Sequence, residues 1–375
     1  MTFDWDPTST TLLGLILLAF VLACEAAVRL ACGVPLGLLR NFIRDHRTLM
    51  ESSTLLRYDP LLGWSLAEPT AAERATMPNL IGAHGIRASS PDRLGVVEGG
   101  ILAVGDSFTF GSDVLDHESW PAQLEQALGE PVINAACGGW AADQAVLRAE
   151  ALVPVFKPKT VIVSCSVESV RDTGAATYAG VPKPYFLVEE GRLVHHNNPV
   201  PPTSAEAGEL GALRAVLGHS YLVVRLMQRL GVAGWSGPAK ETRRTDSDPV
   251  EVTRLLLRRL RRLGERHGFR TVFVMQYGAF HIVGRHEKPY SWVTRFLDAL
   301  RADGIEFVDT WPLVHGTYKQ GMVPFIKLFQ FHDGEFGHMS IEGNRVVADM
   351  IADHLRRQDA APARAMGSDA SPIPA

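Results

Sequence analysis

The chain has 375 residues, 46% of them hydrophobic and 21% charged, and a formal net charge of −4. That length holds one large domain or two ordinary ones, and the near-neutral charge argues against a nucleic-acid-binding protein. The four cysteines form no Cys-x-x-Cys pair and no cluster with histidine, which argues against a disulfide framework and a structural metal site. We therefore expect no metal, no other cofactor and no nucleic-acid partner.

The first predicted element is an apolar helix near the N-terminus. Residues 8–24 carry no charge, and a span extended through Val28 reaches the ~20 residues that cross a bilayer. Glu25 and Arg29, four residues apart, can form an ion pair at its end. The preceding MTFDWDP has two aspartates and no basic residue, which argues against a cleaved signal peptide. We predict a single-pass membrane anchor within residues 1–47, with a buried core helix or a signal peptide as the alternatives.

The charges around this helix bear on its orientation. Arg29, Arg40, Arg44 and Arg47 follow it, whereas only acidic residues precede it. By the positive-inside rule, this distribution places the rest of the chain in the cytoplasm.

From residue 99 onward, apolar runs alternate with amphipathic segments, after a turn-rich extension at 48–98 that we expect to pack on the main domain. The apolar runs predict strands buried on both faces, at residues 100–106, 131–137, 160–166, 270–276 and 305–310. The segments between them predict helices, at residues 119–129, 141–156, 254–268, 291–304 and 340–357. This alternation predicts an α/β domain over residues 99–358, with helices on both faces of a parallel sheet.

Residues 172–248 interrupt the alternation as an insertion. Within it, residues 183–196 predict a hairpin turned at Glu190-Gly191, and residues 210–231 predict a helical stretch. Beyond it, the arginine-rich segment 254–268 carries apolar residues at helical spacing, so we expect its arginines on the solvent face of an amphipathic helix. The small, proline-bearing residues 359–375 predict a disordered tail.

Polar or glycine-rich segments follow three predicted strands, at residues 105–107, 137–139 and 166–169. The carboxyl ends of parallel strands share one edge, where such folds hold their chemistry. Ser107 is a candidate nucleophile, which requires a base and a group that orients the base. We predict His338 as this base, because it lies just before the last predicted helix.

Two further parts of the site are expected around this pair. A carboxylate one helical turn before His338 can fix its tautomer, which indicates Glu335, with Asp333 as the alternative. The Ser107 amide and Gly139, which brings backbone close without a Cβ, are candidate oxyanion donors. Structural roles also stay open: Ser107 as a helix N-cap, His338 as a solvated residue, and residues 138–139 as an ordinary turn.

Three sequence blocks resemble the SGNH or GDSL hydrolase superfamily: GDSFTFG at 105–111, NAACGGWAADQAVLR at 134–148, and a histidine before MSIEGNRVVADMIADHL at 339–355. The upstream YDPLLGW and HGIR resemble a membrane-anchored bacterial subgroup associated with surface polysaccharide. The resemblance implies a flavodoxin-like αβα sandwich with five parallel strands. It also implies Ser107 as nucleophile, His338 as base, Gly139 (or Gly138) as oxyanion donor and Asp106 as a support of the turn.

The third block departs from the family pattern. Glu168 and Ser169 stand where the family carries the asparagine and aspartate of a Gly-x-Asn-Asp motif. An ionised glutamate cannot donate a hydrogen bond to an oxyanion, which leaves the hydroxyls of Ser166 and Ser169 as candidate donors. Glu335, where an aspartate is usual, is a milder departure.

These features predict a serine esterase that cleaves an acyl ester, such as an acetyl ester, on a carbohydrate or lipid. An O-acyltransferase for a surface polysaccharide would use the same residues, and a catalytically weakened binding protein would keep only the fold. Analogy with polysaccharide-modifying relatives places the domain outside the cytoplasm, against the charge pattern, so its side of the membrane stays open.

Overall fold

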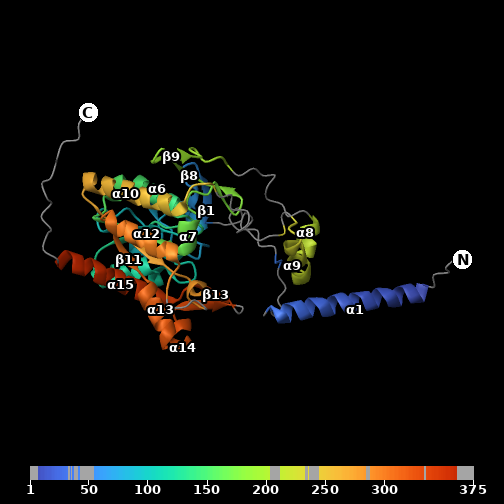
Figure 1. Ribbon diagram of the computed structural model, residues 1–375. Coiled ribbons are helices and arrows are strands. Elements are labelled where there is room, and N and C mark those ends of the chain that lie inside the picture. Colours follow the sequence, from blue (N-terminus) through green and yellow to red (C-terminus); the bar gives the residue numbers. More distant parts are fainter. Residues whose placement is uncertain are drawn as a thin grey trace.

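The fold is built around one parallel sheet, which lies inside the larger body of the molecule (Figure 1). This computed structural model describes residues 7–32, 34, 36–37, 41–42, 55–202, 212–232, 235, 245–283, 288–332 and 335–360. The sheet strands are β3 (Ile101–Gly105), β4 (Val132–Asn134), β5 (Thr160–Ser166), β10 (Arg270–Gln276) and β11 (Glu306–Asp309). Each includes apolar side chains that are buried in the core, and burying one such side chain stabilises the fold by roughly 1.5–3 kcal/mol.

The strand order is β11-β10-β5-β3-β4, with all neighbours parallel. Counted along the chain this is the order 2-1-3-4-5 of flavodoxin-like sheets, whose ligands bind where the connections diverge, between the first and third strands. Here that point lies beyond the carboxyl ends of β3 and β5. The topology confirms the predicted α/β fold class with five parallel strands.

Helices cover both faces of the sheet. On one face lie α6 (Ala142–Phe156), α10 (Pro249–His267) and α12 (Ser291–Ala302), and on the other α5 (Trp120–Leu128) packs against α15 (Ile341–Ala360) (Figure 1). The apolar face of α10 is buried, and its arginines form ion pairs within the chain, among them Arg254 with Asp303 and Arg259 with Glu150. The prediction of an amphipathic helix with a solvent-facing arginine side is confirmed.

The N-terminal extension packs on the start of α6. It contains the antiparallel pair β1 (Leu56–Asp59) and β2 (Gly63–Leu66), followed by α3 (Ala71–Arg74), η1 (Ala83–Gly85) and η2 (Pro91–Arg93). The Trp140 indole donates to the Trp64 carbonyl at 2.9 Å, and the Gln144 amide donates to the Leu62 carbonyl at 2.8 Å. Buried polar groups are therefore paired across this junction.

The short helix α7 (Val167–Arg171) follows β5, and the insertion then contributes β6 (Thr177–Tyr178), β7 (Val181–Pro182), β8 (Tyr185–Glu189), β9 (Arg192–His196), α8 (Ala212–Leu217) and α9 (Tyr221–Arg229). The predicted hairpin is β8–β9, and Glu190 and Gly191 at its turn both have positive φ. A fully buried ion pair, Lys183 Nζ to Asp143 Oδ2 at 2.7 Å, ties this part of the insertion to α6. The predicted helical stretch is two helices rather than one.

The segment before the last helix differs from the expectation. It holds α13 (Trp311–Gln320), α14 (Met322–Ile326) and an antiparallel pair, β12 (Phe329–His332) and β13 (Glu335–Met339). The rings of Phe329 and Phe336 lie 6.0 Å apart, and both pack near Phe325. His338 lies in the second strand of this pair.

The N-terminal helix α1 (Pro7–Ala31) extends away from the sheet domain (Figure 1). Within the described residues, Thr10–Ala31 is long and apolar enough to cross a bilayer, a property it shares with signal sequences. At the other end, residues 359 and 360 continue α15, and the rest of the predicted disordered tail, 361–375, lies outside the described residues.

Candidate active site

Ser107 is the first residue of a short helix, α4 (Ser107–Phe110), that begins directly after β3. A Cβ on Gly105 would lie 2.0 Å from the Ser164 carbonyl oxygen, so this turn requires glycine for β3 to approach β5. The N-cap is Asp106, whose Oδ1 accepts from the Phe108 N–H at 2.9 Å. Asp106 thus performs the capping that was one structural alternative for Ser107.

The second oxygen of Asp106 links two turns. It accepts from the Ser166 N–H at 2.8 Å and from the Ser169 hydroxyl, and the two serine hydroxyl oxygens lie 3.1 Å apart. The structure therefore places Asp106 as a buried support between the turns after β3 and β5. It places the hydroxyls of Ser166 and Ser169 in that support, with Ser166 also capping α7.

His338 comes from β13 and meets Ser107 although 231 positions separate them in the chain. Its Nε2 lies 2.8 Å from Ser107 Oγ, a hydrogen-bond distance. The Phe108 ring contacts the imidazole edge to face, with centroids 5.0 Å apart. The arrangement allows Nε2 to accept the serine proton.

The carboxylate at the other imidazole nitrogen belongs to Asp113, which sequence reasoning missed. Asp113 Oδ2 lies 2.9 Å from His338 Nδ1 and accepts from the His338 N–H at 3.1 Å. The reasoning that indicated Glu335 assumed a helical turn, whereas residue 335 belongs to the strand β13. Asp333 lies outside the described residues.

The loop that carries Asp113 is held by Arg87. Its buried guanidinium donates to three backbone carbonyls of the loop at 2.5–2.7 Å and to Asp116 Oδ1 at 2.7 Å. The carbonyls are those of Phe110, Gly111 and Val114. Burial lowers the pKa of Arg87, and hydrogen bonding to Asp116 acts in the opposite direction. The arginine of the HGIR segment therefore positions the loop that carries Asp113.

Asp113 also needs a glycine opposite it. A Cβ on Gly337 would lie 2.8 Å from Asp113 Oδ2. We expect Gly337→Ala to displace this carboxylate from His338 and to lower kcat by about 10²-fold, the typical cost of a misplaced catalytic group. Steady-state kinetics with thermal unfolding measure the effect. Gly316→Ala, where no atom lies within 4 Å, is the control expected to keep kcat; equal kcat in both variants would contradict this role of Gly337.

Two backbone N–H groups at the site are open to an incoming oxygen. Those of Ser107 and Gly139 have no hydrogen-bond acceptor within the part of the chain that the structure describes. Gly139 has φ +77°, and a Cβ there would lie 3.0 Å from the Tyr178 ring, so a side chain is excluded on both counts. The carbonyl of Gly138 accepts from the Trp64 indole at 3.1 Å. This bond does not involve the N–H of Gly138, which stays the alternative donor.

Tyr178 covers the Gly139 turn as a neutral phenol. Burial raises its pKa to about 12, and the negative charges of Asp172, Asp106 and Glu168 act in the same direction. The phenol therefore stays protonated at any pH at which an imidazole base works.

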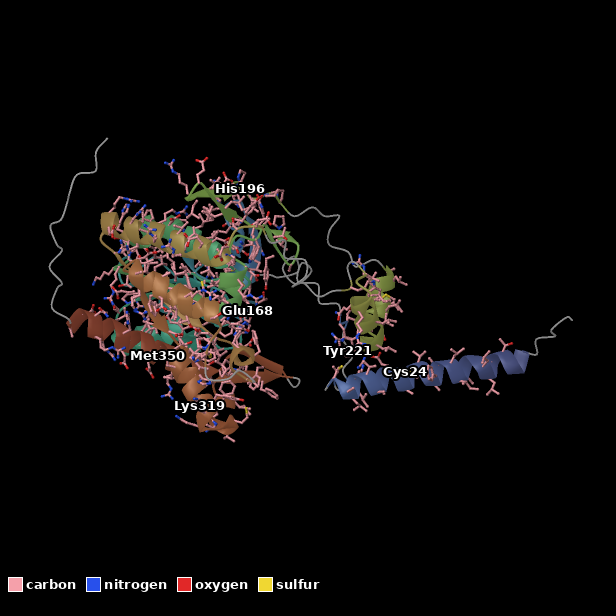
Figure 2. All side chains as sticks on the ribbon, in the orientation of Figure 1. Cys24, Glu168, His196, Tyr221, Lys319 and Met350 are labelled. Atoms are coloured by element: carbon pink, nitrogen blue, oxygen red, sulfur yellow. The ribbon has the colours of Figure 1, made fainter. Side chains whose placement is uncertain are left out.

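Glu168, in the third block, is paired with a buried histidine on α11 (Ala279–Ile282). The distance from His281 Nε2 to Glu168 Oε1 is 2.7 Å, and His281 Nδ1 accepts from the Gly278 N–H at 2.9 Å. Since Nδ1 accepts, the ring proton lies on Nε2 and is donated to the carboxylate. Glu168, labelled on the main body in Figure 2, is 43% exposed and so presents a carboxylate to solvent.

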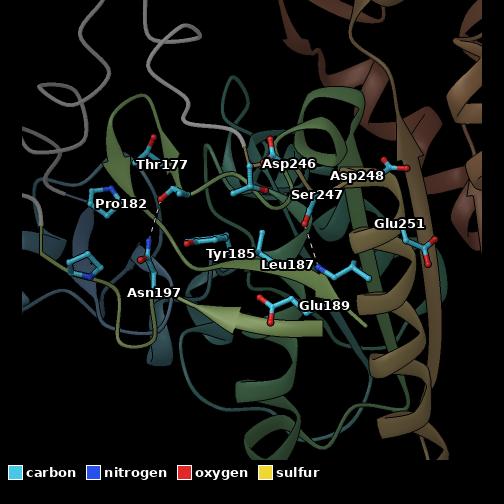
Figure 3. Close-up of a pocket in the computed structure, with 14 residues that line it drawn as sticks. Thr177, Pro182, Tyr185, Leu187, Glu189, Asn197, Asp246, Ser247, Asp248 and Glu251 are labelled. Carbon is cyan, nitrogen blue, oxygen red and sulfur yellow. Dashed lines mark hydrogen bonds between the residues drawn. The ribbon is translucent and has the colours of Figure 1, made fainter. Parts of the chain in front are cut away.

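A pocket of about 800 Å³ lies between the hairpins of the insertion and the start of α10 (Figure 3). Thr177 lines it, while the next residue, Tyr178, contacts Gly139, so strand β6 lies between the pocket and the turn. Among the described residues its lining includes no lysine or arginine. It includes four carboxylates, those of Glu189, Asp246, Asp248 and Glu251. Neutral hydrogen-bonding groups accompany them, from Thr177, Tyr185, Asn197 and Ser247.

Comparisons with known proteins give weak likenesses only. No family model and no curated protein matches the chain. Among solved structures, a putative lipolytic protein of the G-D-S-L family from Desulfitobacterium hafniense is 15% identical, with 68% of this chain and 98% of that chain covered and a TM-score of 0.38. The acetyl xylan esterase AlAXEase is 12% identical (68% and 99% covered, TM-score 0.39), and a lipase/acylhydrolase from Enterococcus faecalis is 13% identical (70% and 97%, TM-score 0.38). Such scores carry no argument about activity.

Proposed function

We propose that this chain is a serine ester hydrolase of the SGNH type, with Ser107 as nucleophile, His338 as base and Asp113 as the group that orients the base. One observation carries the proposal: the continuous chain from Ser107 Oγ to His338 Nε2 at 2.8 Å and from His338 Nδ1 to Asp113 Oδ2 at 2.9 Å. A serine hydroxyl becomes nucleophilic when such a base accepts its proton.

In the proposed reaction, Ser107 Oγ attacks the acyl carbonyl while His338 Nε2 takes its proton. The Asp113 carboxylate holds the Nδ1 proton and stabilises the imidazolium that forms. The N–H groups of Ser107 and Gly139 stabilise the oxyanion. His338 returns the proton to the leaving alcohol, and water then attacks the acyl-enzyme with His338 again as base.

We propose that the N–H groups of Ser107 and Gly139 are the donors that the protein supplies to the oxyanion. The hydroxyls of Ser166 and Ser169 are engaged around Asp106, and Glu168 offers only an acceptor when ionised. The reaction so described requires no cofactor.

The pocket at the insertion favours a carbohydrate ester over a lipid ester as the substrate. Four carboxylates, one amide and four hydroxyls line it beside the apolar Ala176, Pro182, Leu187, Val188 and Pro201. These polar groups suit a ligand rich in hydroxyl donors better than an acyl chain. The Tyr185 ring lies against the His196 imidazole with centroids 5.0 Å apart, which fixes its orientation. An aromatic ring held in this way presents a rigid face to a sugar.

We expect Tyr185→Ala to raise KM for an acetylated oligosaccharide by about 10-fold, because it removes ground-state and transition-state contact equally, and to leave kcat within about twofold. Kinetics with p-nitrophenyl acetate, which carries no sugar, serve as the internal control. Tyr58→Ala, an exposed tyrosine on β1, is the matched variant expected to change neither constant. An unchanged KM in Tyr185→Ala would remove the pocket from the proposal.

The activity itself is tested by incubating the purified chain with p-nitrophenyl acetate and with acetylated polysaccharide, and measuring released p-nitrophenol and acetate. Hydrolysis of either ester supports the proposal. Adding an unacetylated oligosaccharide distinguishes the alternative function, since an O-acyltransferase would move the acetyl group to it. A folded chain inactive in every assay would favour a binding protein.

We also propose that α1 anchors the chain in a membrane as a single pass. Its exposed side chains between Thr10 and Leu22 are almost all apolar, as a lipid-facing helix requires. Carbonate-resistant membrane association of the full chain tests this, and the side on which the α/β domain lies is read by protease protection.

A further inference from the structure

The insertion helix α9 packs against the end of α1, and α8 and α9 lie apart from the sheet domain (Figure 1). The contact centres on Glu25, whose carboxylate caps the start of α9. Its Oε1 accepts from the Tyr221 N–H at 2.8 Å, and its Oε2 accepts from the Leu222 N–H and the Ser220 hydroxyl, both at 2.8 Å. Figure 2 shows Tyr221 beside α1 near Cys24. A carboxylate at a helix N-terminus satisfies the N–H groups that lack intrahelical acceptors.

Arg29 completes this junction. Its Nε lies 2.6 Å from Glu25 Oε1, its Nη2 donates to the His219 carbonyl at 3.2 Å, and its guanidinium lies 4.9 Å from the Phe42 ring centroid. The side chain is 7% exposed. Removing one partner of a buried charge pair leaves the other uncompensated, which makes the junction specific. The only acidic residue within the apolar helix therefore serves to fix α9 to its end.

Among the described residues, none covers a set of apolar side chains on α8 and α9, which we call the leucine face. It consists of Leu213 and Val216 on α8 and Leu226 and Leu230 on or just after α9, with exposed fractions of 68%, 70%, 49% and 66%. Residues at i, i+3 and i+4 share one helix face, so each helix contributes one stripe. The opposite side of α9 is packed through Val224 against Trp235.

Charge flanks the leucine face. Arg225 and Arg229, four residues apart, are exposed on α9 beside it. Residues 212–232 contain three arginines and no aspartate or glutamate. Basic residues beside an apolar stripe are typical of helices that lie in the interface of an anionic membrane.

The position of Glu25 along α1 agrees with a location of α8 and α9 at the membrane interface. Fifteen residues separate Thr10 from Glu25, which is about 22 Å along a helix axis. This length is shorter than a hydrocarbon core about 30 Å thick, so Glu25, the first charged residue after the uncharged segment, lies toward one boundary of that core. The helices docked on Glu25 are then at the level of the head groups.

We propose that α8–α9 is an interfacial membrane element, whose leucine face inserts at the acyl-chain boundary while Arg225 and Arg229 bind anionic phospholipid head groups. The proposal rests on the proposed α1 anchor but not on the proposed esterase activity. In this proposal, part of the insertion binds the membrane and holds the C-terminal end of α1 at the surface of the bilayer.

The test uses the full chain in vesicles of phosphatidylcholine and phosphatidylglycerol, with Cys24 and Cys32 replaced by serine because they are not buried. A fluorophore is attached in turn to Leu226→Cys, to Leu17→Cys on α1, and to Ala215→Cys, an exposed position on α8 away from the leucine face. Lipids brominated on the acyl chain quench it. We expect quenching at residues 17 and 226 to exceed that at 215 at least about threefold, and quenching at 226 to weaken without phosphatidylglycerol.

The outcomes are separable. Quenching at residue 17 with none at 226 would overturn the interfacial element and leave the anchor standing. No quenching at residue 17 would overturn both. A label at 226 shielded from aqueous iodide but not quenched by lipid would place a protein on the leucine face and overturn the proposal. Equal quenching at 226 without anionic lipid would overturn the role of Arg225 and Arg229. Ester hydrolysis measured in detergent tests the enzyme independently.

Discussion

Ser107→Ala and His338→Ala are each expected to lower kcat for ester hydrolysis by about 10⁶-fold, as removal of the nucleophile or the base of such a unit does in a serine hydrolase. The reason is geometric, since the two groups share one proton across 2.8 Å. Because they act as a unit, the double variant should be no slower than either single variant. Single-turnover and steady-state release of p-nitrophenol measure all three.

The matched control is Ser112→Ala, which removes a hydroxyl five residues away in the same segment. Ser112 Oγ contacts only the Ser107 carbonyl, at 3.4 Å, among the described residues. We expect this variant to keep kcat within about twofold. Retained turnover in Ser107→Ala, with the fold intact by circular dichroism, would contradict the assignment of the nucleophile.

Asp113→Asn is expected to lower kcat by about 10⁴-fold with little change in KM. The asparagine is nearly isosteric, but its amide has no negative charge to stabilise the imidazolium. It can also donate to Nδ1, which favours the tautomer with the proton on Nε2, where it blocks acceptance of the Ser107 proton. The pH–rate profile and kcat of the purified variant measure this effect.

The comparison with Glu335→Gln and Asp333→Asn decides which carboxylate orients His338. The contact of Asp113 with both His338 Nδ1 and the His338 N–H predicts that Asp113→Asn is much the slowest of the three. A larger loss in Glu335→Gln or Asp333→Asn would return this role to the residues that the sequence indicated.

The sheet and its main helices could be predicted from local patterns. Strands buried on both faces are continuous apolar runs, and the helices α5 and α10 end at the αL glycines 129 and 268. The turn after β3 could also be predicted from the sequence, because Gly105, Asp106 and Ser107 each have a role in the local structure.

The acid at His338 could not be found in this way. Asp113 reaches the imidazole because Arg87, 26 positions earlier, fixes its loop, and because Gly337 leaves room for the carboxylate. Neither contact leaves a periodic signal in the sequence. The β12–β13 pair does have a signal in the sequence. Asp333-Gly334 between phenylalanines is typical of a hairpin turn, and this turn would have placed His338 on a strand.

The docking of α9 on α1 could not be predicted from the sequence either. The spacing of Glu25 and Arg29 indicates an ion pair, which the structure shows at 2.6 Å. It does not reveal that the same carboxylate caps a helix almost 200 positions later, because that contact depends on the tertiary position of Ser220 and Tyr221.

Covalent labelling tests the central claim most directly. The native chain is incubated with a fluorophosphonate, digested, and the modified peptide is identified by mass spectrometry. The account predicts a single adduct on Ser107, formed at a strongly reduced rate in both His338→Ala and Asp113→Asn. An adduct on another serine, or labelling of Ser107 at the same rate without the imidazole, would contradict it.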